Sequence, residues 1–222
     1  AKGYRHGRPA AAKKLAACRA WIFRQMRNAV IAAGGILDRQ GKIRSSQIPT
    51  IVSCSFSGAP GRAKCNVLEA LGLAFHAAQD FYSHTNWTDV AAPGPPTVTN
   101  PPGLHHRGAA PWIDPRQRAG MPRGLISGCY EGIPESRYCK GRVRHADLNK
   151  DKGSIDVGNG RAGAGTTPRG KVNRNFARAV QGAVADTRAK WAWFETTVIQ
   201  RYGVARGRRI VCAIRQDRPK GC

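Results

Sequence analysis

Residues 75–87 carry the side chains whose types and spacing fit chemistry best. They read FHAAQDFYSHTNW, which places His76, Asp80 and His84 at intervals of four residues. On a helix each interval of four residues turns by about 40°, so the three side chains share one slowly winding stripe. Zinc accepts imidazole nitrogen and carboxylate oxygen as ligands, so the spacing predicts a metal site. A polar helix face with a His–Asp pair is the alternative interpretation.

Three segments have the apolar spacing of long helices, and the second of them carries this stripe. They are residues 9–33, 66–84 and 172–201. Asn66 with Glu69 three residues later has the form of a capping box, which predicts where the second helix begins. The sequence therefore predicts a mainly α fold in a single domain over residues 1–222.

The segments between these helices are rich in Gly and Pro. Residues 91–128 contain the run APGPPTVTNPPG, which favours extended and solvated backbone. Residues 129–170 are expected to stay irregular. The C-terminal extension, residues 203–222, contains RRIVCAI, which could form a short strand. We therefore expect long functional loops between the helices.

Cysteine usage favours an oxidising compartment. The chain has seven cysteines, and three pairs of them bracket short loops that a disulfide could close. The remaining cysteine, Cys18, lies in the first predicted helix and is the candidate for a free thiol, although it could instead displace a member of a pair. The opening residues contain no apolar signal core, so we expect a mature or processed chain that is secreted, extracellular or periplasmic. The three pairs are Cys54/Cys65, Cys129/Cys139 and Cys212/Cys222.

The net charge predicts anionic partners. Lys and Arg number 37 against 13 Asp and Glu, a formal net charge of +24. A field of one sign concentrates polyanions and speeds their encounter, so a phospholipid surface and nucleic acid are both candidates. A basic surface that serves only solubility or adhesion is the alternative. No run of about 18 apolar residues is present, so we expect no transmembrane segment. The oligomeric state stays open.

The string LGLAFHAAQDFYSHTNW resembles the signature of the Het-C family, which includes the Het-C region of von Willebrand factor A domain-containing proteins. That family is similar in turn to the helical zinc-dependent phospholipase C and P1 nuclease group. Residues 76–87 follow the pattern H-x-x-Q-D-F-[FY]-[AS]-H-[ST]-N-W, and residues 144–151, RHADLNKD, resemble a later block with a His and an N-K-D element. The resemblance covers residues 66–195. It implies a helical bundle of the phospholipase C/P1 nuclease kind with long disulfide-stapled loops.

Carried over by residue, the resemblance implies a zinc centre. Asp80 and His84 would be both catalytic residues and ligands, and the number of Zn²⁺ ions stays open. Zinc in this group activates a hydroxide that attacks phosphorus, which is sensible chemistry because the metal also neutralises phosphate charge. Asn86 and Trp87 would shape the site. The full set of implied metal ligands is His76, Asp80, His84, His145, Asp147 and His6.

The resemblance and the charge together predict a secreted, metal-dependent phosphodiesterase of the phospholipase C kind. A nuclease that acts on DNA or RNA with the same metal site is the first alternative. A non-catalytic basic binding or toxin module is the second. It is motivated by the stretch TTPRGKVNRNF, where the family usually has further histidines and this chain has none.

Asp147, Asn149 and Asp151 allow another interpretation. Oxygen ligands at positions 1, 3 and 5 resemble the start of a calcium loop. Position 6 is Lys152 where such a loop has Gly, and position 12 is Gly158 where it has Glu. An Asx-rich turn is the simpler interpretation of this segment.

Overall fold

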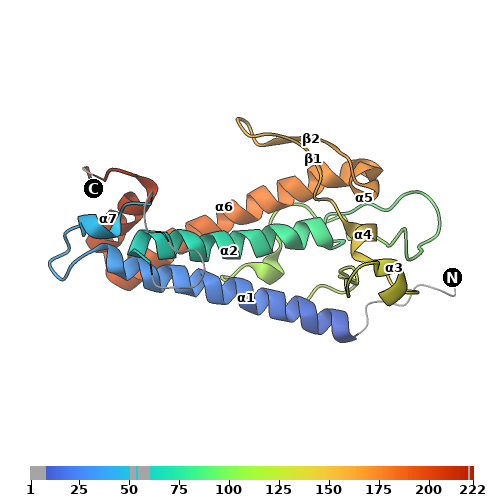
Figure 1. Ribbon diagram of the computed structural model, residues 1–222, viewed down its shortest axis with the longest axis horizontal. Coiled ribbons are helices and arrows are strands. Elements are labelled where there is room, and N and C mark those ends of the chain that lie inside the picture. The colour runs from blue at the N-terminus through green and yellow to red at the C-terminus, as the bar shows by residue number, and fades with distance from the viewer. Residues whose placement is uncertain (1–8, 51–53, 55–60, 220) are drawn as a thin grey trace. The chain divides into compact units, whose positions relative to one another are not determined.

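The computed structural model describes residues 9–50, 54, 61–219 and 221–222. Helices hold 54% of the described residues and strands 7%, which confirms the mainly α fold class. The long helices are α1 (Pro9–Ala33), α2 (Ala63–His84), α6 (Asn175–Tyr202) and α7 (Val204–Arg215) (Figure 1). None of the helices in this described part is long and apolar enough to cross a membrane.

The chain forms two compact units. One consists of Ala1–Arg19 and Ala77–Ala189, and the other of Ala20–His76 and Lys190–Cys222. The first carries most of the loops and is called the loop unit below, and the second is called the terminal unit. Helices α1, α2 and α6 each contribute residues to both units, so each unit is described by itself.

In the terminal unit, α2 begins three residues earlier than the sequence predicts. The backbone N–H of Ala63 donates to Gln47 Oε1 at 2.8 Å, so a side chain from another segment satisfies a donor that the helix start leaves open. Asn66 lies inside the first turns, and its amide exchanges hydrogen bonds with the Gly61 backbone. The capping box predicted at Asn66 is therefore wrong.

The expected C-terminal strand is also wrong, because RRIVCAI lies in α7. The β-branched residues of this run imitate a strand, yet the buried positions follow the spacing of a helix. A Cβ at Gly207 would lie 2.4 Å from Ile199 Cα, so the glycine allows α7 to pack closely on α6. The buried residues of α7 are Gly207, Ile210, Val211, Ala213 and Ile214.

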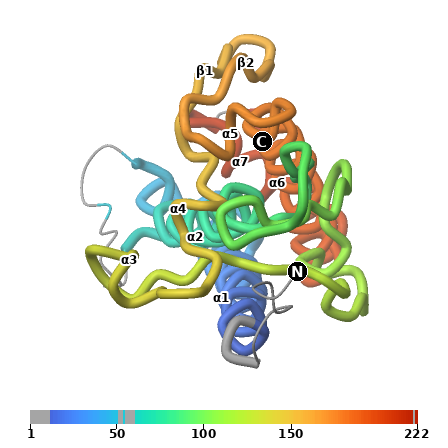
Figure 2. Tube along the Cα trace, turned by 90° about the vertical axis from the view of Figure 1, so that its right-hand side faces the viewer, coloured from blue at the N-terminus to red at the C-terminus, as the bar shows by residue number. Residues whose placement is uncertain are grey.

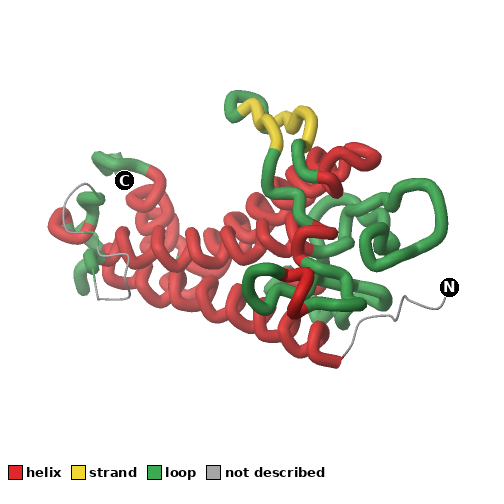
Figure 3. The backbone as a smooth tube through the Cα atoms, turned by 45° about the vertical axis from the view of Figure 1, so that its right-hand side comes forward, coloured by secondary structure: helices red, strands yellow, loops and turns green. Residues whose placement is uncertain are grey.

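The loop unit contains short elements where the sequence predicts irregular chain. Figure 3 shows that loops and short helices make up most of residues 85–175. The antiparallel strands β1 (Gly153–Asp156) and β2 (Arg161–Gly165) form a hairpin beside α5 (Pro168–Lys171), as Figures 1 and 2 both show. The expectation for residues 129–170 is therefore wrong in part. The other short helices are η3 (Pro111–Ile113), α3 (Glu135–Tyr138), α4 (His145–Leu148) and η4 (Val172–Arg174).

Tyr82 anchors the end of α2 in the core of the loop unit. The side chain is fully buried, and its hydroxyl accepts a hydrogen bond from the Ala110 N–H at 2.7 Å. A Cβ at Gly182 would lie 2.6 Å from the Tyr82 ring, so the glycine lets α6 approach α2 closely. The end of α2, where the predicted chemistry lies, is thus held by dense packing.

The three disulfides join the cysteine pairs that lie close together in the sequence, as predicted. Cys54–Cys65 and Cys212–Cys222 lie in the terminal unit, and Cys129–Cys139 closes a loop of the loop unit. Cys18 is the free cysteine, and its thiol contacts the Ala77 carbonyl oxygen. Burial raises the pKa of this half-buried thiol, which disfavours the reactive thiolate.

Candidate metal centre

His84 is the last residue of α2. The next residue, Thr85, is buried, and its hydroxyl donates to the Phe81 carbonyl oxygen at 2.6 Å. Such a bond from side chain to backbone satisfies a carbonyl that the helix end leaves open. The imidazole of His84 is 22% exposed. Its Nδ1 is buried and has no hydrogen-bond partner among the described residues, which is the state of a ring nitrogen that could accept a metal.

The N-K-D element is attached to the end of α2 through Lys150. The ammonium group of this lysine is fully buried and donates to the Thr85 carbonyl oxygen at 3.0 Å. Its backbone N–H donates to the Ser83 carbonyl oxygen at 3.2 Å. These bonds bring the next residue, Asp151, to His84, and Asp151 Oδ1 lies 3.3 Å from His84 Nε2.

Lys150 has a carboxylate partner inside the protein. The Lys150 ammonium lies 3.1 Å from Asp89 Oδ1, and Arg169 Nε donates to Asp89 Oδ2 at 2.8 Å. Burial is the largest influence on the pKa of Lys150 and lowers it, and Asp89 opposes that shift. All three side chains are at most 3% exposed, so they form a buried ionic network behind the centre.

His145 begins α4 and contacts the loop that the Cys129–Cys139 disulfide closes. The His145 N–H donates to the Cys129 carbonyl oxygen at 2.9 Å, which pairs the two chain segments. A Cβ at Gly128 would lie 2.4 Å from the His145 backbone, so only glycine fits this approach. His145 Nδ1 lies 3.4 Å from Glu135 Oε1 in the same disulfide loop. A carboxylate on one ring nitrogen leaves the other nitrogen to bind a metal.

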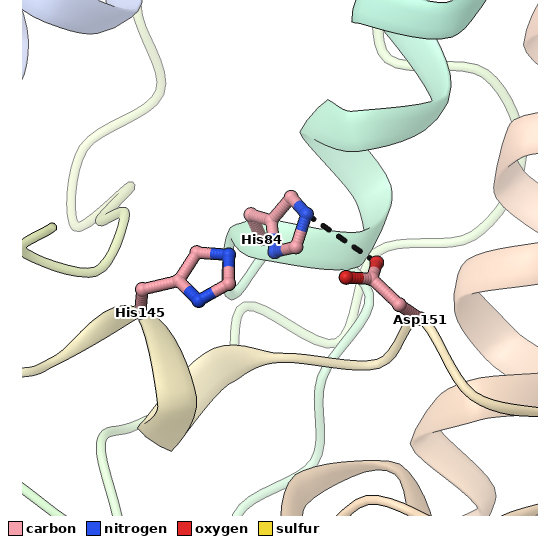
Figure 4. Close-up of side chains that lie close together, drawn as sticks. All are labelled: His84, His145 and Asp151. Atoms are coloured by element: carbon pink, nitrogen blue, oxygen red, sulfur yellow. Dashed lines mark ion pairs between the residues drawn. The ribbon is translucent and has the colours of Figure 1, made fainter. Parts of the chain in front are cut away.

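His84, His145 and Asp151 form a group that could hold a metal ion. One ligand atom from each residue lies within 4.8 Å of the others. The imidazole centroids are 4.3 Å apart, and His84 lies between the other two side chains (Figure 4). Ligand atoms on one tetrahedral zinc lie roughly 3.3–3.5 Å apart, so small side-chain adjustments would close the group around an ion.

Electrostatics favours the metal-binding form of His84. Burial is the largest cause and lowers the pKa of this imidazole, and His145 lowers it further, whereas Asp151 raises it. A lowered pKa keeps the ring neutral at pH 7, and a neutral ring nitrogen is the ligand. The carboxylate of Asp151 would then balance the charge of a bound cation.

The other residues that the sequence singled out lie in different places. Asp80 is next to the group, with its Oδ1 3.9 Å from His84 Nε2. Asp147 lies two residues after His145, but both of its carboxylate oxygens bind the Arg144 side chain. His76 is exposed on α2 and does not belong to the group. His6 lies outside the described residues.

Asp151 and Glu135 are the residues that sequence reasoning did not assign to the metal. Asp151 belongs to the N-K-D element, so the motif could have identified it as a candidate ligand. The Asp147 carboxylate binds Arg144 and the Asp151 carboxylate faces His84, so the segment does not use these oxygens as a calcium loop would. Glu135 precedes His145 by ten residues with no spacing rule to connect them.

Asn86 and Trp87 shape the surroundings of the centre. Asn86 is fully buried and cross-links three loop segments: its amide donates to the carbonyl oxygens of Pro102 and Gly124 and accepts from the Ile126 N–H. Trp87 is buried beside Phe81. Neither residue belongs to the group, and their part in shaping a metal site stays a prediction.

A cavity of about 520 Å³ opens beside the centre. Asp80 and Asp151 lie at one of its walls, and Arg188 also lines it. Much of the remaining lining is apolar and comes from α6 and β1. A mostly apolar hollow with a few convergent polar groups is the usual form of a ligand site. The apolar lining residues are Ile155, Phe176, Ala179, Val180, Ala183 and Val184.

Comparisons with known proteins give no relative. No protein-family model matches the chain. No curated protein and no solved structure matches it either. The function must therefore be argued from the site itself.

Proposed function

We propose that the protein is an exported, metal-dependent phosphodiesterase whose Zn²⁺ is held by His84, His145 and Asp151. The observation that carries the proposal is this three-residue group, whose Asp151 also lines the 520 Å³ cavity. Two imidazoles and one carboxylate are a donor set that suits zinc. The buried His84 Nδ1 without a hydrogen-bond partner supports the fit.

The openness of the centre supports catalysis over a structural role. Structural zinc sites have four protein ligands, whereas catalytic ones have three and keep a position for water or substrate. The three side chains here are 22%, 31% and 41% exposed for His84, His145 and Asp151. A bound zinc ion would activate water and neutralise phosphate charge.

The chain's own residues supply the other requirements of phosphodiester hydrolysis. Asp80 lies close enough to His84 to accept a proton from an attacking water or to complete the ligand set. Arg188 on the cavity wall can bind the anionic phosphate. Glu135 holds the ring of His145 through Nδ1.

The apolar cavity lining supports a phospholipid substrate, because acyl chains need apolar surface. The net charge of +24 supports the alternative, a nuclease. The three disulfides support export, because they persist in oxidising compartments. The resemblance to the Het-C family supports the same reaction class.

The experiment combines elemental analysis with activity on phospholipids, single- and double-stranded DNA, and RNA. His145→Ala should remove stoichiometric zinc and activity together. Glu135→Gln should weaken zinc binding by about 10–100-fold, because it removes the partner of a ligand. The matched control is Glu131→Gln in the same disulfide loop, whose carboxylate binds Arg142 and should leave zinc binding unchanged.

If the purified protein contains substoichiometric zinc and chelation leaves its melting temperature unchanged, the proposal of a zinc enzyme is refuted. Stoichiometric zinc without turnover of any substrate in the panel would favour the non-catalytic binding or toxin module. His76→Ala tests the wider ligand set that the resemblance implies. Loss of zinc in that variant would add His76 to the centre.

A further inference from the structure

A second site lies in the loop unit, away from the metal centre. It is a cavity of about 250 Å³ lined by three arginines together with His106, Ala177 and Gln181. The arginines are Arg107, Arg174 and Arg178. We name it the arginine pocket. None of these residues belongs to the His84, His145 and Asp151 group.

The arginine pocket contains positive charge without compensation. Some other arginines of the loop unit have carboxylate partners, as in the pairs Arg144–Asp147 and Arg169–Asp89. Within the described part of the chain, none of the three pocket arginines forms an ion pair with Asp or Glu. No acidic residue lines the cavity. Converging guanidinium groups repel one another, so an anion between them would stabilise the arrangement.

Unusual backbone conformations surround the arginine pocket. Three non-glycine residues of the described chain have positive φ: His105 at 59°, Asn173 at 47° and Arg174 at 59°. Arg174 lines the pocket, and the other two directly precede lining residues. Such conformations cost about 1–3 kcal/mol each and concentrate at functional sites.

Specific contacts hold both strained segments in place. The His106 ring stacks on the buried Trp87 ring with centroids 4.0 Å apart, and the backbone N–H of His106 donates to the Trp87 carbonyl oxygen. On the other side, the Asn173 amide donates to the Ala91 carbonyl oxygen at 2.8 Å. Arg178 Nε donates to the Asn173 carbonyl oxygen at 3.2 Å, which orients its guanidinium group. These contacts fix the backbone on both sides of the arginine pocket and orient the side chain of Arg178.

We propose that the arginine pocket binds a phosphate group. Guanidinium groups bind phosphate oxygens through paired, parallel hydrogen bonds. The positive end of the 28-residue helix α6 lies beside Ala177 and Arg178 and adds to the attraction. A volume of about 250 Å³ admits a phosphate and part of the group that it esterifies. The pocket does not depend on zinc or on the proposed reaction.

The test is calorimetric titration of the full chain, with a metal chelator present, using inorganic phosphate, glycerol 3-phosphate and adenosine monophosphate. Saturable binding of inorganic phosphate is expected. Arg174→Gln and Arg107→Gln should each weaken it by about 10–100-fold, as expected for the loss of a charge-assisted hydrogen bond. The two esters distinguish the source, because tighter binding of one than of inorganic phosphate identifies a headgroup or a nucleotide.

Arg161→Gln is the matched control, since it removes the same charge from an exposed position on β2. It should change phosphate affinity by less than about twofold, because Arg161 does not line the arginine pocket and salt screens its charge. If all three substitutions weaken phosphate binding equally, the effect comes from the net charge of the protein, and the proposal is overturned. Absence of saturable binding by the wild-type protein would overturn it as well. Arg107→Gln keeps the test valid if Arg174→Gln fails to fold, because Arg107 is an exposed loop residue.

Discussion

At the scale of single residues, Lys150 decides where Asp151 lies. Its ammonium group binds the Thr85 carbonyl oxygen and the Asp89 carboxylate without exposure to water. Burying a charge is costly unless it is paired and hydrogen-bonded. The network therefore gives a defined position to the chain segment that carries Asp151.

Lys150→Met should destabilise the protein by about 3–5 kcal/mol, because it removes one member of a buried ionic network and leaves Asp89 undercompensated. Urea unfolding followed by circular dichroism measures the change. The control Lys152→Met alters an exposed lysine two residues away and should change stability by less than about 0.5 kcal/mol. A loss below about 1 kcal/mol for Lys150→Met would contradict the role of the network.

At the scale of elements, the Cys129–Cys139 loop organises the second half of the metal centre. It carries Glu135, which faces His145, and Tyr130, whose ring lies 5.4 Å from the His145 ring. The backbone of Cys129 pairs with the chain around His145. The disulfide is thus a cross-link that also supports a candidate metal ligand.

Replacing Cys129 and Cys139 by Ala should cost about 3 kcal/mol, given a loop closed over ten residues. It should also weaken zinc binding, because the loop whose Glu135 contacts His145 becomes mobile. Thermal unfolding and zinc titration measure the two effects.

The chain provides its own control for this pair. Cys212–Cys222 closes a loop of the same sequence separation, but lies in the terminal unit. Its double Ala variant should lose similar stability and keep its zinc affinity. If both double variants lose zinc affinity equally, the disulfide loop has no specific part in the centre.

At the scale of the whole molecule, the net charge of +24 governs encounters with anionic partners. Residues 75–99 contain no Lys or Arg and include the end of α2 with His84. Under the proposed function, the cationic residues would attract a substrate and the metal group would supply the chemistry.

The affinity for double-stranded DNA should fall by about 100-fold between 50 and 200 mM salt, if about four phosphates are contacted, since bound counterions are released on association. Fluorescence anisotropy at graded salt measures the slope, and vesicles of neutral lipid are the control surface. Affinity that does not change with salt would show that the charge does not drive recruitment.

The sequence by itself determined the features that depend on local pattern. The apolar spacing predicted the α1 helix with the bounds that the structure has, and near-neighbour spacing predicted the three disulfides. His84 and His145 were both candidate ligands by motif. The single domain over residues 1–222 stays a prediction.

Only the tertiary structure decided which of these side chains meet. Asp151 joins His84 because Lys150 is buried against a carbonyl group 65 residues away, and Glu135 joins His145 through a disulfide loop. The start of α2 depended on Gln47, and α7 became a helix because its apolar face packs on α6. Such contacts join residues far apart in the chain. The periodic pattern of a sequence cannot predict them, because it describes only residues within a few helical turns of one another.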